Sequence, residues 1–270
     1  MQKMLIVVAV MLFVGLCAGA SVKVEAPVQE VVEDKGSVYI GLAGSGQTVS
    51  VEVYEKTAVG GTHGTGGRWD QLVITSVPEG WNSSSSLLYE EPLKAKIRIS
   101  PNASDGAYML TAVVVDENNG EKLGNVTIYL IVNVSVEVLD IEVSPKEVRT
   151  GAGQPGGYYI TIKNRGVASD VFLVGSTGVP LWKFKKTVFV PYESERIVRY
   201  EVVSAEEKTV EVEFQVVSTS SPLIHAEKKA TLVVSTSLSS DYRAVGSGTL
   251  IFPGIELPVY SILGFLSNWI

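Results

Sequence analysis

The sequence contains only one cysteine, Cys17, and two histidines, His63 and His225, among its 270 residues. A single thiol forms neither an internal disulfide nor a cysteine-based zinc site. The two histidines lie in different halves of the chain, so the sequence offers no two-histidine metal face and no serine triad with a local partner. We therefore expect no catalytic residues, no cofactor and no metal, and we do not expect an enzyme.

Basic residues are also few, and none of them forms a tract. The chain carries 22 Lys and Arg against 29 Asp and Glu, a net charge of −7. An acidic chain of this kind argues against nucleic acid and against anionic lipid as electrostatic partners.

Apolar runs long enough to span a bilayer are missing as well. The apolar run at residues 4–16 is shorter than the roughly 20 residues that a membrane helix needs. It follows Lys3 and precedes the small residues 18–20, which is the order of a secretory signal. We predict a signal peptide over residues 1–20, cleaved after Ala20, and an extracellular, cell-surface location. An uncleaved anchor is the alternative.

From residue 21 to about 236, apolar residues recur at every second position in short runs separated by Gly, Pro, Asn and Ser. This period is typical of β-strands with one buried face. In residues 209–217, for example, Val210, Val212 and Phe214 share one face and acidic residues share the other. Runs of this kind in the second half lie near residues 139–143, 157–163, 170–175, 186–190, 196–203, 209–217 and 228–234. Their number and length predict an immunoglobulin-like β-sandwich.

The chain repeats itself. DQLVITSVPEGW, residues 70–81, reappears as DVFLVGSTGVPLW, residues 170–182, and the offset stays nearly constant through the later runs. A repeat of this length indicates a duplicated domain. We predict two sandwiches of matching topology, with Trp81 and Trp182 in equivalent positions.

The boundary is visible as a change of parity. Even-numbered residues from 126 to 138 are apolar, and the odd-numbered Leu139, Ile141 and Val143 then take over. A one-residue slip exchanges the buried face for the exposed one. We predict an all-β protein with two tandem immunoglobulin-like β-sandwiches, residues 21–138 and 139–236, followed by a linker and a short apolar helix within 237–270. The absence of a Gly/Ser-rich linker at 138 predicts a stiff tandem.

A glycine-rich insertion, AVGGTHGTGGR at residues 58–68, distinguishes the first half. It lacks the Lys-Ser/Thr pair of a phosphate loop. We predict a contact loop in which His63, Arg68 and Trp69 reach a partner, with a tolerated surface insertion as the alternative. A second loop, DENNG at 116–120, has oxygen ligands for calcium, but a hairpin turn is favoured.

Four Asn-x-Ser/Thr triplets all lie in the first half, at Asn82, Asn102, Asn125 and Asn133. The alternation along residues 125–135 places Asn125 and Asn133 opposite the valine face, where a glycan has room. The triplets predict a glycoprotein.

The C-terminal residues are strongly apolar. Pro258 suits the first turn of a helix, and apolar residues then recur at helical spacing, namely Val259, Ile262, Leu263, Leu266, Trp269 and Ile270. We predict that this tail docks into an envelope protein or lies in the membrane interface. The alternative is that it folds back onto its own sandwich.

Three segments carry a family resemblance: VPEGW (77–81), ISPNASDGAYMLTAVVVD (99–116) and YYITIKNRGVASDVFLV (158–174). They resemble the immunoglobulin-like modules of secreted bacterial and archaeal proteins, in particular NPCBM-associated domains and CARDB-type adhesion-related domains. The resemblance implies an extracytoplasmic spacer or binding module and no active-site residue. We expect a protein of an archaeal cell envelope that acts as a stiff spacer or adhesion module. A carbohydrate-binding accessory subunit of a secreted glycosidase, with a glycan as partner, and a filament subunit are the alternatives.

Overall fold

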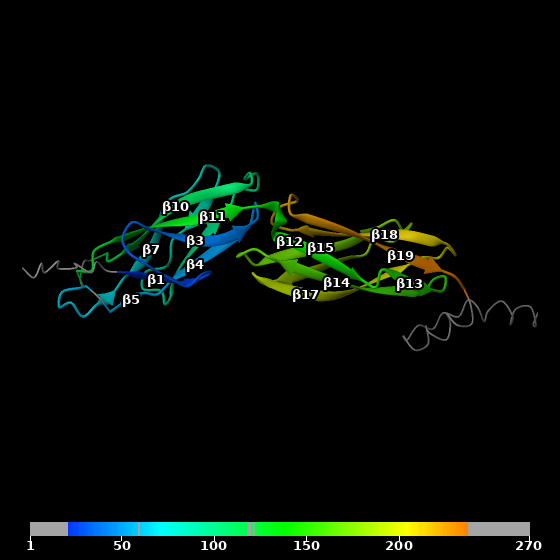
Figure 1. The fold of residues 1–270 in the computed structure, drawn as a ribbon, viewed down its shortest axis with the longest axis horizontal. Coiled ribbons are helices and arrows are strands. Elements are labelled where there is room, and N and C mark those ends of the chain that lie inside the picture. The colour runs from blue at the N-terminus through cyan, green and yellow to red at the C-terminus, as the bar shows by residue number, and fades with distance from the viewer. Residues whose placement is uncertain (1–20, 59, 118–119, 121, 237–270) are drawn as a thin grey trace, which may run out of the picture.

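The computed structural model describes residues 21–58, 60–117, 120 and 122–236, which form two β-sandwiches arranged end to end (Figure 1). The all-β fold class is confirmed. In the described part of the chain, the single helical element is a 3₁₀ turn, η1 (Val136–Val138), and no helix is long and apolar enough to cross a membrane. The predicted signal peptide and the predicted C-terminal helix with its docking residues lie outside the described residues.

The first sandwich packs a five-stranded sheet, in the order β2-β1-β4-β9-β8, against a four-stranded sheet, β3-β11-β10-β7. Strand β11 pairs in parallel with β3 and antiparallel with β10. The strands are β1 (Val22–Ala26), β2 (Glu30–Val32), β3 (Gly36–Ala43), β4 (Thr48–Val53), β7 (Gln71–Ser76), β8 (Asn82–Ser84), β9 (Leu93–Arg98), β10 (Gly106–Val115) and β11 (Val126–Val134). A separate two-stranded ladder, β5 (Lys56–Thr57) with β6 (Gly67–Arg68), closes the glycine-rich insertion.

The second sandwich packs a three-stranded sheet, β12-β14-β17, against a five-stranded sheet, β13-β19-β18-β15-β16. Its strands are β12 (Leu139–Ser144), β13 (Glu147–Thr150), β14 (Pro155–Asn164), β15 (Asp170–Thr177), β16 (Lys185–Val190), β17 (Ser194–Val203), β18 (Thr209–Ser218) and β19 (His225–Val234). Strand β13 pairs in parallel with β19, as β3 does with β11. Seven of these strands follow the runs predicted from the sequence, and the short β13 was missed.

The topologies of the two sandwiches match except at their edges. The edge strand β2 of the first sandwich has no counterpart beside β12 in the second, and one further edge strand changes sheet. Strand β8 pairs with β9, whereas its counterpart β16 pairs with β15 and so joins the opposite sheet. In the first sandwich Ser86 already occupies the free edge of β7. The backbone amide of Ser86 donates to the Leu72 carbonyl, and the Ser86 hydroxyl oxygen accepts from the Leu72 amide, so β8 cannot pair there. The prediction of fully matching topology is therefore wrong at these edge strands.

The two repeated tryptophans do lie in equivalent places. Each follows the counterpart strands β7 and β15 and ends a turn: the amide of Trp81 donates to the Pro78 carbonyl at 3.1 Å and that of Trp182 to the Val179 carbonyl at 3.3 Å. Trp81 is buried and Trp182 is half-buried.

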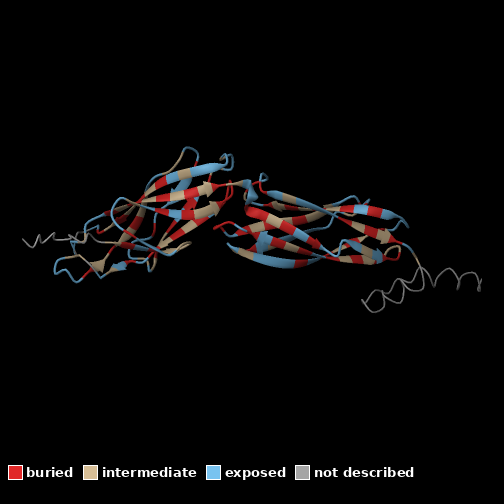
Figure 2. Cartoon of the chain, viewed as in Figure 1, coloured by how far each residue is buried: buried red, intermediate tan, exposed pale blue. Residues whose placement is uncertain are grey.

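The alternation of buried and exposed residues along the strands follows the predicted parity (Figure 2). Along β18 the apolar residues are buried and most of the residues between them are half-buried or exposed, as expected for a strand with one face on a core. The alternation of buried and exposed residues along β11 was predicted to continue to residue 138, but the strand ends at Val134. Val136 is 40% exposed, because the chain turns through η1 after the Ser135 side chain caps the Glu137 amide.

Tyr158, at the centre of the second core, is expected to make stability depend on alkaline pH. Its hydroxyl donates to the Thr231 carbonyl at 2.9 Å, and burial, reinforced by the charge of Glu147, raises the pKa of Tyr158 to about 12 from 10.0. Below pH 10 the phenol of Tyr158 is neutral in both the folded and the unfolded chain, so its full contribution to the free energy of unfolding is present. As the pH rises from 10.0 toward 12, the unfolded chain loses its proton first, and the free energy of unfolding falls by roughly 1.4 kcal/mol per pH unit.

Urea unfolding across this pH range, for the natural chain and for Tyr158→Phe, measures the effect. The variant is expected to lose about 1 kcal/mol at neutral pH, from the missing hydrogen bond, and to show a smaller alkaline decline. An equal decline in both proteins would mean that other groups cause it.

Candidate functional site: the junction between the sandwiches and the adjoining sheet face

A four-residue turn recurs at the same end of both sandwiches. It reads Gly44-Ser45-Gly46-Gln47 between β3 and β4, and residues 151–154 repeat it as Gly-Ala-Gly-Gln between β13 and β14. In each turn the glutamine Oε1 accepts from the amide of the first glycine, at 2.7 Å and 3.1 Å. The second glycine has a positive φ of 74° in one turn and 72° in the other, a conformation that favours glycine.

In the first sandwich this turn makes the junction with the second. Gln47 is buried, and its Nε2 donates to Oδ2 of Asp170 across the boundary at 2.7 Å. Asp170, 3% exposed, also accepts from the hydroxyls of Ser218 and Ser220 at 2.7 Å and 2.8 Å and from the Val171 amide at 2.7 Å. A buried carboxylate is stable when its oxygens are hydrogen-bonded in this way.

Apolar and backbone contacts surround this hydrogen-bond network. Val167 of the second sandwich is buried in the core of the first, and its amide donates to the Leu42 carbonyl at 2.7 Å. Gly46 leaves no room for a side chain, because a Cβ atom there would lie 2.3 Å from the Ser220 carbonyl oxygen. A Cβ atom on Gly44 would likewise lie 2.3 Å from Cδ1 of Ile224. The two sandwiches therefore share a packed boundary as well as a peptide connection.

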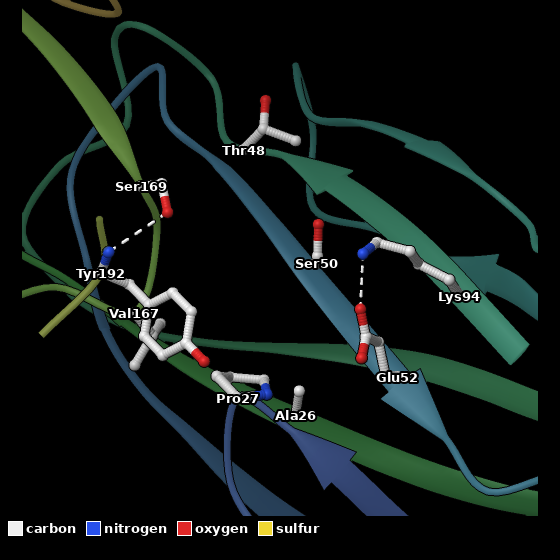
Figure 3. Close-up of a pocket in the computed structure, with 9 residues that line it drawn as sticks. All are labelled: Ala26, Pro27, Thr48, Ser50, Glu52, Lys94, Val167, Ser169 and Tyr192. Carbon is white, nitrogen blue, oxygen red and sulfur yellow. Dashed lines mark hydrogen bonds and ion pairs between the residues drawn. The ribbon is translucent and has the colours of Figure 1, made fainter. Parts of the chain in front are cut away.

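A polar cleft of about 240 Å³ opens beside this boundary (Figure 3). Side chains of β4 and β9 line it on one side, and three residues of the second sandwich, with the segment after β1, line it on the other. The lining residues are Thr48, Ser50, Glu52, Lys94, Val167, Ser169, Tyr192, Ala26 and Pro27. Lys94 pairs with Glu52, and Tyr192 is held by its amide, which donates to Ser169 Oγ at 3.2 Å. Hydroxyls, one ion pair and one aromatic ring are groups that bind polar ligands.

The cleft opens onto a cationic strand. The residues of β9 that alternate with its buried ones are Lys94, Lys96 and Arg98. Across β4 they face Glu52, Ser50 and Thr48. The net charge of the whole chain, which is negative, does not reveal this local group of cations. The alternation in LKAKIR, apolar and basic by turns, is the signal that reveals it.

The structure places the three residues of the predicted contact loop differently: it contradicts the prediction for Trp69, and contact of the loop with a partner stays a prediction. His63 is exposed in the loop between β5 and β6, at the end of the molecule away from the junction (Figure 1). Arg68 pairs with Glu91 and donates to the Tyr89 carbonyl, so its side chain is held against its own sandwich. Trp69 is fully buried, and its Nε1 donates to the Gly124 carbonyl at 3.3 Å. Trp69 is a core residue because its large apolar ring stabilises the core more than it could a solvated loop.

The four predicted glycan acceptors lie on accessible parts of the first sandwich. Asn82, Asn102 and Asn125 are exposed and Asn133 is half-buried on the outer face of β11. Asn82 lies opposite Arg98 in the β8–β9 ladder. Their modification stays a prediction.

The loop after β10 is a turn held together by Asp116. Its carboxylate accepts from the amides of Gly120 and Leu123, both at 3.1 Å. Among the residues that the structure describes, no three His, Cys, Asp or Glu side chains come together as a metal site would require.

Comparisons with known proteins bear on the fold alone. No family model and no curated protein matches the chain. Similar solved structures include the CARDB domain of the PF1109 protein from Pyrococcus furiosus in complex with di-metal ions, at 16% identity and a TM-score of 0.29 over 38% of this chain and 94% of that one. A beta-glucosidase from Listeria innocua is 17% identical with a TM-score of 0.25, over 35% of this chain and 16% of that one. WR4, an MSP family member of C. elegans, is 11% identical with a TM-score of 0.24, over 35% of this chain and 97% of that one. Scores this low define no family and no activity. The immunoglobulin-like description rests on the strand order above.

Proposed function

We propose that the protein is a secreted component of a cell envelope that acts as a stiff two-domain spacer or adhesion module. The observation that carries the proposal is the junction, in which the buried Gln47 and Asp170 join the two sandwiches by a hydrogen bond at 2.7 Å. Tandem domains joined by a plain linker move independently. A packed and hydrogen-bonded junction holds one arrangement, which is what a spacer needs to set a distance.

The same proposal includes the extracellular location, the glycan acceptors and the apolar C-terminal tail as the point of attachment to an envelope protein or a membrane interface. In this role the chain needs no catalytic residues and no cofactor. The resemblance to CARDB-type and NPCBM-associated modules supports the proposal, as does the end-to-end arrangement of the sandwiches (Figure 1).

The stiffness of the junction can be measured with two spin labels. After Cys17 the sequence has no cysteine, so the exposed Glu79 and Glu207 can be replaced by cysteine and labelled specifically, one in each sandwich. We expect a narrow distance distribution. Gln47→Ala removes a hydrogen bond to a carboxylate, worth about 1.5–3 kcal/mol, and should broaden the distribution.

Gln215→Ala is the matched control, because Gln215 bonds only Glu227 within the second sandwich. It should leave the distribution narrow. A distribution that is already broad in the natural chain would rule out a stiff spacer.

A second candidate, a carbohydrate-binding accessory subunit, is favoured by one observation. Tyr39, Ile131 and Met109 lie in register across β3, β11 and β10 on the outer face of their sheet. Tyr39 is 54% exposed and Met109 is 63% exposed. Tyr39 lies diagonal to Tyr129 in the β3–β11 ladder, so two aromatic residues share this face. The filament alternative gains no such support, because residues 22–32 form β1 and β2 of their own sandwich.

A further inference from the structure

Two cations on β9 have no partner. Among the described residues, the side chains of Lys96 and Arg98 form no hydrogen bond and no ion pair, whereas the side chain of Lys94 on the same strand pairs with Glu52. Both side chains are exposed on the outer face of the first sandwich. Although the net charge of the chain is −7, these two exposed cations, one residue apart on a strand, form a local patch of positive charge. Alternate residues of a strand lie about 7 Å apart, so the two charges act on a single bound anion chain.

Small polar side chains flank these cations on both neighbouring strands. Lys96 faces Ser50 on β4 and Ser84 on β8, and Arg98 faces Thr48 and Asn82. Directly opposed residues have Cβ atoms about 5 Å apart. Each cation therefore has a hydroxyl group beside it, from Ser50 and Ser84 or from Thr48, and the Asn82 amide adds a further group in chains where Asn82 carries no glycan.

The platform continues into the junction cleft. Thr48 and Ser50, which face the two cations, also line the cleft, and Tyr192 of the second sandwich stands across from them (Figure 3). Tyr192 is 46% exposed and offers the face or edge of its ring to a ligand. One continuous surface thus presents an aromatic ring, several hydroxyls and two free cations.

We propose that this surface, made by the outer face of β9 with β4, β8 and the junction cleft, binds an anionic polysaccharide whose sugars carry carboxylates. Arg98 and Lys96 bind the carboxylates, the flanking hydroxyls bind the sugar hydroxyls, and Tyr192 packs against a ring in the cleft. This inference rests on the proposed envelope location for where such a glycan is met, and it adds a ligand to what is otherwise a spacer.

Other anionic partners fit this face less well. Single-stranded nucleic acid is held by stacking of successive bases on several aromatic residues, whereas this surface offers one ring, Tyr192, and none at the strand positions that face the two cations. Duplex nucleic acid needs many phosphate contacts. A membrane surface is held by larger basic clusters together with inserted apolar residues, and the strand residues facing Lys96 and Arg98 are all polar.

The test compares two double variants of the full chain. Lys96→Ala with Arg98→Ala removes the two free cations. Lys163→Ala with Arg196→Ala is the matched control, because it removes two exposed cations of β14 and β17 that also lack an acidic partner among the described residues. Binding to a galacturonate oligomer is measured by calorimetry at low and moderate salt. A neutral galactose oligomer, a poly-glutamate peptide, a single-stranded oligonucleotide and phosphatidylglycerol vesicles are the comparison probes.

We expect the natural chain and the control to bind the galacturonate oligomer, more weakly as salt rises, and the β9 variant to lose about tenfold or more in affinity. An equal loss in both double variants would show an effect of net charge and would overturn the proposal. Absence of binding, or tighter binding to any comparison probe, would do the same. Binding or absence of binding to the galacturonate oligomer does not affect the spin-label distance distribution. The glycan-binding proposal can therefore fail while the spacer role stands, and the reverse.

Discussion

Replacing Asp170 by alanine is expected to destabilise the second sandwich by about 3–5 kcal/mol and to loosen its contact with the first. The carboxylate is 3% exposed and accepts from Gln47, Ser218 and Ser220. Without it, the Gln47 amide and the Ser218 hydroxyl, both buried, lose this acceptor, and each unsatisfied buried donor costs about 1–3 kcal/mol. The loss therefore exceeds the value of any one of the bonds.

Denaturant unfolding followed by tyrosine and tryptophan fluorescence measures the change, and the spin-label pair reports the junction. Asp140→Ala is the matched control, since Asp140 is an acidic residue that pairs with Arg165 at the surface, where such pairs contribute about 0–1 kcal/mol. If Asp170→Ala unfolds no more easily than Asp140→Ala, the buried network does not stabilise the junction.

Replacing Trp69 by alanine is expected to cost about 3–5 kcal/mol in the free energy of unfolding of the first sandwich. The side chain is fully buried and its Nε1 donates to the Gly124 carbonyl. The substitution leaves a large cavity and an unpaired carbonyl. If Trp69 were instead a contact residue of the loop, the same change would weaken partner binding and leave stability almost unaltered.

Scanning calorimetry assigns the loss of stability in Trp69→Ala to one sandwich, because we expect only the unfolding temperature of the first sandwich to fall. Trp182→Ala in the second sandwich is the comparison. Trp182 is only half-buried and its Nε1 has no hydrogen-bond partner in the described structure, so we expect a smaller loss, about 1–3 kcal/mol. Equal losses would mean that burial does not distinguish the two rings.

The fold was largely predictable because its signal is local. A period of two along a strand follows directly from the geometry of the backbone, so residues such as Val212 and Phe214 could be assigned to the core from sequence. The short β13 was not predictable in this way, since its four residues are too few to show a period. Ser86, which occupies the edge of β7, acts through a hydrogen bond that no periodic pattern encodes.

The candidate site was less predictable because it joins residues distant in sequence. Gln47 and Asp170 are 123 residues apart, and neither is unusual in its local sequence. The assignment of Trp69 to a contact loop failed for the same reason, because a tryptophan beside glycines looks exposed until Gly124 is placed next to it. Lys96 and Arg98 were visible in the alternation of β9, but only the structure shows that they lack acidic partners.

The position of the Gly-x-Gly-Gln turn gives the molecule a direction. The chain leaves the first sandwich beside this turn, where the Ser135 amide donates to the Ala43 carbonyl at 3.0 Å. It leaves the second sandwich in the same way, where the Ser235 amide donates to the Thr150 carbonyl at 2.9 Å. In the first sandwich the next segment is thus delivered beside the turn at high effective concentration, as a short tether does for a second binding event. The tethered segment is the domain that supplies Asp170, so the covalent path itself raises the probability that the correct surface docks.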